Sequence, residues 1–347
     1  MIAVTGASGL LGANLVRELL AQAQRVQVRA VIHHDQRALV GLDVEVSSAD
    51  LADPASLERA FTGVDVVYHL AGLISLRMDD WEDVQRVNVL GTRNVVEACL
   101  RCGVKRLVHV GSVQARRPRP FDRPLDEDRP LITGPAAPPY ERSKALGELE
   151  VQKGLERGLD AVILLPSGIL GPYDFRPSYL GAALQQMQRG DLPALITGGY
   201  DWVDARDVAA GALRAANVAP SGSRYILSGH WLSIREVARM VAQISGMPVS
   251  RLVVPLWLAK LGLPLMDTLA RWNGSQPLYT RAMLNALDSN RLITHARATR
   301  DLMYLPRPFR ETLADTLAWF AQHVLPQSHR DTEKKSNKDS VSPRLRG

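Results

Sequence analysis

Short apolar runs alternate with longer segments of helical periodicity through the first half of the chain. The runs of strand length are Ile2 to Thr5, Val26 to Ile32, Val64 to His69 and Leu107 to Val110. Between them lie segments whose apolar positions have helical spacing: Ala13 to Ala23, Ser56 to Phe61 and Trp81 to Cys102. Such regular alternation predicts a parallel sheet with helices on both of its faces.

The second half follows a less regular pattern. A helix is expected from Tyr140 to Arg157 and a strand from Ala161 to Leu165, after which prolines and glycines at 166–172 interrupt the alternation. Ser233 and Glu236 form a capping box that predicts a helix reaching Ser245. The other predicted elements are helices at Leu180 to Arg189, Asp207 to Asn217 and Phe309 to Val324, and strands at Trp202-Val203 and Tyr225 to Leu227.

Two segments fall outside these patterns. A connection rich in proline and arginine runs from Arg116 to Pro139, and connections of this length are usually functional or disordered. The last segment, Ser328 to Gly347, holds six Lys/Arg and three Asp/Glu, so it supplies +3 of the formal net charge of +6. We expect this charged tail to be disordered.

The composition is that of a soluble globular protein. The 347 residues are 46% hydrophobic and 22% charged, which is enough to bury a core and to form one large domain or two. Charge outside the tail is nearly balanced, and aromatic residues make up only 5% of the chain. Both features argue against a nucleic-acid partner, which needs clustered basic and stacking side chains.

Neither the cysteines nor the apolar stretches change this picture. Cys99 and Cys102 have the spacing of a redox motif, but they end an apolar helical run, where cysteine commonly acts as a small hydrophobic residue. No further Cys/His cluster supplies metal ligands, so no metal is expected.

The stretch from Leu252 to Ala270 is interrupted by prolines and charges, which argues against stable membrane insertion and favours the lining of a hydrophobic substrate pocket. The N-terminus lacks the basic region of a signal peptide, and a cytoplasmic location is expected.

A glycine-rich turn follows the first strand and opens a helix. Glycine permits a positive φ in such a turn and lets a pyrophosphate approach the backbone, while the free N–H groups of the helix start attract phosphate. A turn of this composition and position predicts a dinucleotide site. Its candidate binding residues are Gly6, Ser8, Gly9, Leu10, Leu11 and Gly12.

The end of the second strand indicates which dinucleotide is preferred. A carboxylate at this point accepts a hydrogen bond from the ribose 2′-OH of NAD, whereas a basic group binds the 2′-phosphate of NADP. Ile32 and His33 occupy the expected acidic position, and Arg37 lies close by. NADP(H) is therefore favoured, although Asp35 leaves NAD(H) open and a solvated loop would also explain the histidines.

Three residues form a candidate catalytic group. Tyr140 and Lys144 are spaced i and i+4 on one predicted helix, so the ammonium lies one turn from the phenol and is expected to lower its pKa. The same lysine can hold the hydroxyls of the nicotinamide ribose. Ser112 follows the strand Leu107 to Val110, at the carboxyl edge of the predicted sheet where ligands bind. Its hydroxyl can donate to the same substrate oxygen as Tyr140.

At this point the chain resembles the extended short-chain dehydrogenase/reductases. The motifs that carry the resemblance, in the expected order, are Thr5 to Gly12, Asp50-Leu51, His69-Leu70-Ala71-Gly72, Asn88-Val89-Leu90-Gly91-Thr92 and the triad of Ser112, Tyr140 and Lys144, with the likeness continuing through Leu170-Gly171-Pro172 to Trp319-Phe320. The resemblance implies a Rossmann-type α/β fold, a doubly wound parallel sheet with a smaller C-terminal α/β domain, together with an NAD(P) cofactor and a small-molecule substrate.

The resemblance also implies individual roles. Tyr140 would be the general acid/base, Lys144 would tune Tyr140 and hold the ribose, Ser112 would polarise the carbonyl, and Asn88 would assist the proton relay. A homodimer built on the helices near 81–102 and 140–157 is implied in the same way. Beyond the phosphate turn, His33 and Arg37, the implied cofactor contacts are Asp50, Leu51, Leu70, Ala71, Gly72, Pro166, Gly168 and Ile169.

The chain departs from one branch of the family. Members that act on nucleotide sugars commonly show Arg-x-x-Asn before a Tyr-Gly-Pro-like turn, and the run Leu164 to Pro172 lacks these groups. The sequence is closer to the dihydroflavonol 4-reductase and 3β-hydroxysteroid dehydrogenase-like branch, including at Tyr173 to Ser178 and at Trp202 to Val208. Within the latter run, Asp204 and Arg206 are interpreted as a structural ion pair, with Asp207 capping the next helix.

The expected function is that of an NAD(P)-dependent oxidoreductase that interconverts a carbonyl and an alcohol on a small hydrophobic substrate. One alternative is a nucleotide-sugar epimerase or dehydratase with retained NAD, in which Arg176, Arg206 or Arg281 would bind the diphosphate. Another is a non-catalytic dinucleotide-sensing protein, although such proteins often lose the tyrosine or the lysine that this chain retains.

The expected domain division follows from the same resemblance. Residues 1–165, with a returning strand near 202–228, would form the NAD(P)-binding Rossmann domain. Residues 166–201 and 229–327 would form the substrate-binding domain, and residues 328–347 the disordered tail.

Overall fold

A seven-stranded parallel sheet carries the first half of the chain. The structure is a computed structural model, and it describes residues 1–23, 26–250, 252–263 and 281–323. The strand order is β10-β6-β5-β4-β1-β2-β3, with all neighbours parallel. The chain therefore winds outward in both directions from β1 and β4, and the crevice between their carboxyl ends is where such sheets bind ligands. The predicted α/β Rossmann-type fold is confirmed.

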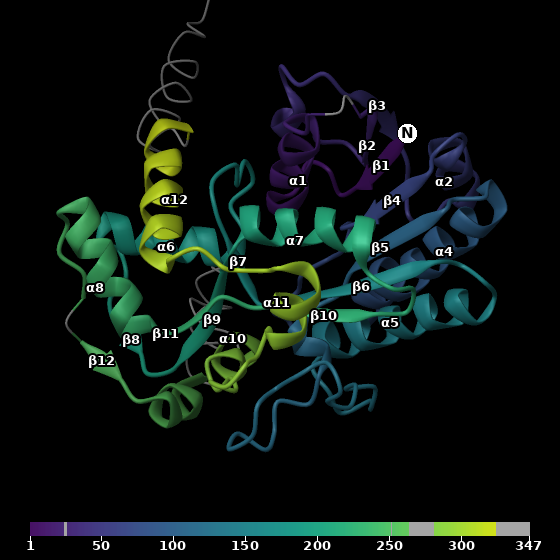
Figure 1. The fold of residues 1–347 in the computed structure, drawn as a ribbon. Coiled ribbons are helices and arrows are strands. Elements are labelled where there is room, and N and C mark those ends of the chain that lie inside the picture. Colours follow the sequence, from purple (N-terminus) through teal and green to yellow (C-terminus); the bar gives the residue numbers. More distant parts are fainter. Residues whose placement is uncertain (24–25, 251, 264–280, 324–347) are drawn as a thin grey trace, which may run out of the picture.

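Helices cover both faces of this sheet (Figure 1), and each face has its own apolar core. Successive strand residues point to opposite faces, so Ala3 and Val4 lie in different cores. The strands are β1 (Ile2–Thr5), β2 (Val28–Ile32), β3 (Glu45–Ser48), β4 (Val66–His69), β5 (Arg106–Val110), β6 (Ala161–Pro166) and β10 (Arg224–Leu227). One face carries α1 (Leu10–Leu20), α7 (Ala205–Val218) and α11 (Ala296–Leu302), and the other carries α2 (Pro54–Phe61), α4 (Gly91–Cys102) and α5 (Pro139–Glu156).

A smaller part begins where β6 ends, at the carboxyl edge of the large sheet. Its three-stranded sheet has the order β11-β9-β7, and β12 pairs with β8. Trp202 and Val203 lie in β9 of this sheet, whereas the strand that returns to the large sheet is β10. Its elements are β7 (Gly168–Leu170), α6 (Tyr179–Arg189), β8 (Leu195–Ile196), β9 (Gly199–Asp204), β11 (His230–Ser233), α8 (Ile234–Ser245), β12 (Val253–Val254), α10 (Arg281–Ala286) and α12 (Phe309–His323). Figure 1 shows α6, α8 and α12 grouped at one side of the large sheet.

The helix predicted over 81–102 is interrupted. The structure contains α3 (Trp81–Val84), a π-helical turn at Gln85–Leu90, and then α4. A π-helical turn accommodates one extra residue per turn, and such turns are frequent at functional sites. Here it carries Asn88, one of the candidate site residues.

The long connection at 116–139 is anchored at both of its sides. The buried Asn290 amide donates to the carbonyl oxygens of Pro118 at 3.1 Å and Arg123 at 3.0 Å. The buried Glu127 carboxylate accepts a hydrogen bond of 2.8 Å from the backbone N–H of Ile226, in the edge strand β10. These contacts hold the connection against the sheet. Of the two expectations for this segment, functional or disordered, the structure therefore argues against disorder.

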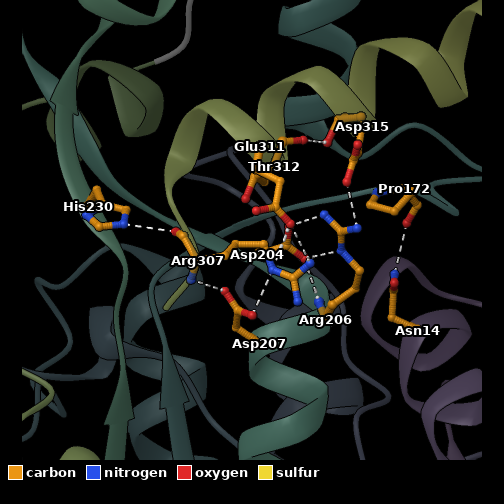
Figure 2. A network of polar contacts seen from close by, with 11 residues as sticks. Asn14, Pro172, Asp204, Arg206, Asp207, His230, Arg307, Glu311, Thr312 and Asp315 are labelled. Carbon is orange, nitrogen blue, oxygen red and sulfur yellow. Dashed lines mark hydrogen bonds and ion pairs between the residues drawn. The ribbon is translucent and has the colours of Figure 1, made fainter. Parts of the chain in front are cut away.

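A polar network joins α7 to the start of α12 (Figure 2). Asp204 and Arg206 form the expected ion pair, at 2.8 Å between Oδ2 and Nη2. The predicted cap was wrong, because the N-cap of α7 is Asp204, which accepts from the Arg206 N–H at 2.7 Å. Asp207 lies in the first turn and accepts from the backbone N–H and Nε of Arg307, both at 2.8 Å. Arg206 also pairs with Asp315 of α12, so the network fixes α12 to the start of α7.

Both cysteines are free thiols, and burial raises the pKa of Cys99. They pack as small residues at the end of α4, as their position in the apolar run predicts. Within the described ranges, none of the helices is both long and apolar enough to cross a membrane. The predicted charged tail and residues 264–270 of the predicted apolar stretch lie outside the described residues.

Candidate active site

The turn after β1 has the geometry of a phosphate-binding loop. Gly6 has φ +69°, and a Cβ there would lie 2.7 Å from the backbone nitrogen of Ala71. A Cβ on Gly12 would overlap the carbonyl oxygen of Gly6, so both positions require glycine. Helix α1 starts after Gly9 with no side-chain cap and no acidic residue in its first turn. Its N–H groups and partial positive charge are therefore available to a pyrophosphate, and the loop fits a dinucleotide.

The segment after β2 has pairings that the sequence did not predict. Arg37 binds Asp35 through two nitrogens, with Nη2 to Oδ2 at 2.6 Å and Nε to Oδ1 at 3.0 Å. This contact lowers the pKa of Asp35 to about 2. His33 lies 3.7 Å from Asp50, and both side chains are largely exposed. The basic groups proposed for a 2′-phosphate are thus present, but the Arg37 charge is shared with Asp35.

The structure brings two of the three candidate catalytic residues close together. The Ser112 hydroxyl accepts a hydrogen bond from the Gln114 N–H at 3.2 Å and is near enough to Tyr140 to lower the pKa of the phenol. Ser112 is delivered by the end of β5, and Tyr140 by the first turn of α5, which begins at Pro139. Lys144 follows one turn later and donates from Nζ to the carbonyl oxygen of Val110 at 2.9 Å.

The charge states of this group differ from the sequence-based expectation. Burial raises the pKa of Tyr140 to about 12, although the neighbouring Ser112 hydroxyl opposes that shift. Lys144 is not among the groups that act on the pKa of the phenol, and burial lowers the pKa of Lys144 itself to about 8. The phenol is therefore protonated at neutral pH, and the lysine loses its charge at a lower pH than an exposed lysine does.

Asn88 connects the segment after β4 to α5. Its amide oxygen accepts from the Leu73 N–H at 2.8 Å, and its amide nitrogen donates to the Leu73 carbonyl and to the Ser143 hydroxyl, each at 2.9 Å. Gly72 lies beside this amide, since a Cβ there would be 3.1 Å from Asn88 Oδ1 and 3.7 Å from Lys144 Nζ. The residue fixes the relative position of three segments that surround the site.

The remaining predicted cofactor contacts lie along the carboxyl edge of the sheet. Leu70, Ala71 and Gly72 follow β4, and the Ala71 N–H donates to the Thr5 hydroxyl at 3.3 Å. Pro166 ends β6, while Gly168 and Ile169 lie in β7 of the small sheet. Leu51 follows the carboxyl end of β3, lies against Gly91 of α4, and accepts a hydrogen bond from Asn94 through its carbonyl.

Several residues at the site were not found from the sequence. His69 bridges Thr5 and Thr92 through its two ring nitrogens, at 2.8 and 3.2 Å, and burial lowers its pKa to about 3, so the ring stays neutral. Gly147 lies where α5 crosses the π-helical turn. A glycine inside a helix costs stability and usually has a packing reason, and this is the signal by which Gly147 could have been found. Another such residue, Glu141, lines the cleft at Tyr140 and is half-buried.

A small cleft, about 20 Å³ in volume, opens between the segment after β4 and α10 of the smaller part, and Tyr140 is part of its lining. The lining is mostly apolar or neutral and includes two ionisable residues, Arg77 and Glu141. The lining residues are Ser75, Leu76, Arg77, Gln114, Pro138, Pro139, Tyr140, Glu141 and Ala286.

Comparison with known proteins agrees with this geometry. Residues 2–227 match the NAD dependent epimerase/dehydratase family. The chain belongs to this family. It is 35% identical, over 92% of its length and 98% of the relative's, to the sterol demethylase protein B of Methylococcus capsulatus. It is 29% identical, over 88% of its length and 94% of the relative's, to the 2-alkyl-3-oxoalkanoate reductase of Stenotrophomonas maltophilia.

A solved structure supports the same assignment. The crystal structure of gox2253 is 31% identical in sequence and superposes with a TM-score of 0.81, covering 93% of this chain and 98% of that one. Together these likenesses identify the chain as an NAD(P)-dependent oxidoreductase of the extended short-chain dehydrogenase/reductase type.

Proposed function

We propose that this enzyme interconverts a ketone or aldehyde and the corresponding alcohol on a hydrophobic substrate, with Tyr140 as the acid/base. The observation that carries the proposal is that Tyr140 lines the cleft and has the Ser112 hydroxyl near enough to counteract part of the effect of burial on its pKa. Two hydroxyl groups this close together can both reach one substrate oxygen, which is what carbonyl polarisation and proton transfer require.

Each residue of the group has a defined task in this proposal. The bound nicotinamide supplies or accepts the hydride. Ser112 donates to the substrate oxygen and holds it, while the protonated Tyr140 gives that oxygen its proton during reduction and takes it back during oxidation. Lys144, anchored on Val110, holds the ribose side of the cofactor, and Asn88 positions the segments around it.

The preference for a hydrophobic substrate rests on the cleft and its rim. The segment after β4 exposes Leu73, Ile74 and Met78, with Ile74 at 51%, directly beside the cleft residues Ser75 to Arg77. The names of the two relatives refer to a sterol and to a 2-alkyl-3-oxoalkanoate, and the apolar part of these compounds is the property that supports the proposal. Trp257, Leu258 and Leu261 are exposed rather than part of the lining found here.

We propose NADP(H) as the preferred cofactor, with NAD(H) as the alternative. Support comes from His33 in place of an acid directly after β2 and from the neighbouring Arg37. The Asp35 carboxylate opposes this preference, but it is bound by Arg37 rather than directed to an open ribose position.

The nucleotide-sugar alternative gains no support from the arginines it would use. Arg206 is already held by Asp204 and Asp315, and the side chain of Arg281 lies outside the described part of the chain. Arg176 would be left to bind a diphosphate. The retained tyrosine and lysine likewise favour an enzyme over a sensing protein.

We also propose the division into a cofactor domain (1–165 with a returning segment near 202–228) and a substrate domain (166–201 and 229–327), and a homodimer formed through α4 and α5.

Cofactor exchange separates the proposed reductase from the epimerase. The freshly purified protein is denatured, any released nucleotide is identified by mass spectrometry, and the emptied protein is titrated with NADPH and NADH. An exchanging reductase releases substoichiometric nucleotide, binds NADPH more tightly, and oxidises it with hydrophobic ketones or aldehydes. Stoichiometric NAD that does not exchange would contradict the proposal, because epimerases recycle their cofactor in place.

A further inference from the structure

A second ionisable group faces the cleft next to Tyr140. Glu141 is the following residue in the first turn of α5, and both line the cleft together with Gln114 and Arg77. Ala286 of α10 borders the same space from the smaller part of the molecule. A substrate whose reacting oxygen lies at Tyr140 therefore places neighbouring atoms beside Glu141.

The carboxyl group of Glu141 lacks a partner among the residues that the structure describes. Burial is the sole cause acting on its pKa, which rises to about 7, with no contribution from a hydrogen bond or a neighbouring charge. Its oxygens are not among the fully enclosed side-chain atoms that lack a partner, so water can reach them. A ligand in the cleft can therefore replace water as the donor to this carboxyl group.

The charged groups around Glu141 are all engaged elsewhere. Arg77, across the cleft, is bound to Asp79 through two nitrogens at 2.9 and 3.0 Å. On the same helix, Lys144 donates to Val110, and the Arg142 guanidinium lies over the ring of Trp81 at 3.9 Å. Tyr140 is neutral, and Gln114 carries no charge. The cleft thus offers one uncompensated carboxyl group and no free cation along its described lining.

We infer that Glu141 determines specificity by accepting a hydrogen bond from a hydroxyl or N–H group that the substrate carries close to its reacting carbonyl, and by excluding substrates with an anionic group at that place. This inference rests on the proposed function, because it places the reacting carbonyl at Tyr140. A carboxylate attracts a donor and repels a carboxylate or phosphate, and the effect strengthens when the cleft is shielded from water.

Three probes with the same chain test the inference. They are 1-hydroxydodecan-3-one, which has a donor, 1-methoxydodecan-3-one, which lacks it, and freshly prepared 3-oxododecanoate, which has a carboxylate on the equivalent carbon. The wild-type kcat/KM should favour the hydroxyl over the methoxy probe by about tenfold or more, the strength expected of one hydrogen bond to a charged group. Discrimination against the carboxylate should increase between about pH 6 and about pH 8.5, as Glu141 loses its proton.

Two substitutions separate the charge from the hydrogen bond. Glu141→Gln keeps an acceptor of the same shape, so it should retain part of the preference for the hydroxyl while losing the pH-dependent exclusion of 3-oxododecanoate. Glu141→Leu should lose both. Glu156→Gln, an exposed glutamate near the end of the same helix, is the matched control and should behave as wild type.

Binding measurements distinguish a failure of this inference from a failure of the proposed function. If the wild type turns over none of the probes, their dissociation constants on the enzyme–NADP⁺ complex are measured by calorimetry. The same order of affinities in the wild type, lost in Glu141→Leu and without the pH-dependent exclusion of 3-oxododecanoate in Glu141→Gln, would support Glu141 while the proposed reaction fails. An unchanged order in Glu141→Gln and Glu141→Leu, or no binding of any probe to the wild-type complex, would overturn the inference.

Discussion

A Cβ atom added to Gly147 would lie 2.6 Å from the carbonyl oxygen of Asn88. Helix α5, which carries Tyr140 and Lys144, therefore crosses the π-helical turn with no room for a side chain at this point. The close approach also allows the Asn88 amide to reach Ser143. Backbone contact between these two segments sets the height of α5 above the sheet, and with it the position of the phenol.

Gly147→Ala should accordingly separate α5 from the turn. We expect a loss of about 1–3 kcal/mol in the free energy of unfolding, typical of overpacking, together with a fall in kcat because the phenol moves. Denaturant unfolding and steady-state kinetics check both effects. Gly134→Ala is the control, because a Cβ there meets no atom within 4 Å. Wild-type stability in Gly147→Ala would show that α5 and the π-helical turn can move apart at this point without a loss in the free energy of unfolding.

Tyr140→Phe removes the proton donor and leaves the ring. Acid/base catalysis commonly contributes about 10²–10⁴ to a rate, so kcat should fall by that order while the dissociation constant of the cofactor stays within about twofold. Stopped-flow turnover and cofactor titration provide the two measurements. Tyr179→Phe, at an exposed tyrosine in α6, should leave both unchanged. Activity close to wild type in Tyr140→Phe would remove the phenol from the mechanism.

Lys144→Ala should weaken cofactor binding as well as turnover, since the lysine is proposed to hold the ribose. The pKa of Lys144 in the free enzyme is lowered to about 8, so the ammonium is present below that pH and lost above it. Cofactor affinity of the wild type should therefore decline as the pH rises through about 8. The decline should be absent in Lys144→Ala and retained in Lys153→Ala, whose lysine pairs with Glu150 near the end of the same helix. Isothermal titration calorimetry of the cofactor at several pH values, on the wild type and both variants, measures this pH dependence.

Arg37→Ala tests the cofactor preference. If Arg37 contributes to binding a 2′-phosphate, the affinity for NADPH should fall by about tenfold while that for NADH changes little. Arg59→Ala, at an exposed arginine 3.8 Å from Asp53, is the matched surface control. Equal losses for the two cofactors would indicate that Arg37 acts through Asp35 and the shape of the loop.

Glu141 should also leave a signature in the pH dependence of stability. Its folded-state pKa is raised from 4.5 to about 7, so between these values the folded protein holds a proton that the unfolded chain releases. Stability from this group is therefore lost as the pH rises through that window. Glu141→Gln should gain melting temperature relative to wild type from about pH 4.5 to about pH 7, and the difference should level off above it. A constant difference measured by scanning calorimetry would mean that the carboxyl titrates normally.

The large sheet and its helices could be predicted because their signals are local. The apolar spacing of α5 and the capping box of α8 each determine an element within a few residues. The small sheets could not be predicted in this way, since β8 and β12 have two residues each and show no periodicity. Their pairing depends on contacts between distant segments, as does the π-helical turn inside the predicted helix 81–102.

The candidate site shows the same division. Spacing along the chain was sufficient to propose Ser112, Tyr140 and Lys144 as one group. It could not predict that burial would dominate the pKa of the phenol or that Arg37 would bind Asp35, because both depend on the surroundings in three dimensions. Unpartnered groups such as the Glu141 carboxyl become visible only when every neighbour is known.

The hydrogen bond from Ile226 to Glu127 limits how this molecule can associate. Strand β10 is the last of the large sheet, and a free row of donors there would accept a strand from a second copy. The Glu127 carboxylate accepts the hydrogen bond of the Ile226 N–H. The connection at 116–139, which contains Glu127, therefore lies against the outer edge of β10. A continuous sheet across two copies would have to displace that connection from β10, so pairing through helices keeps each fold intact.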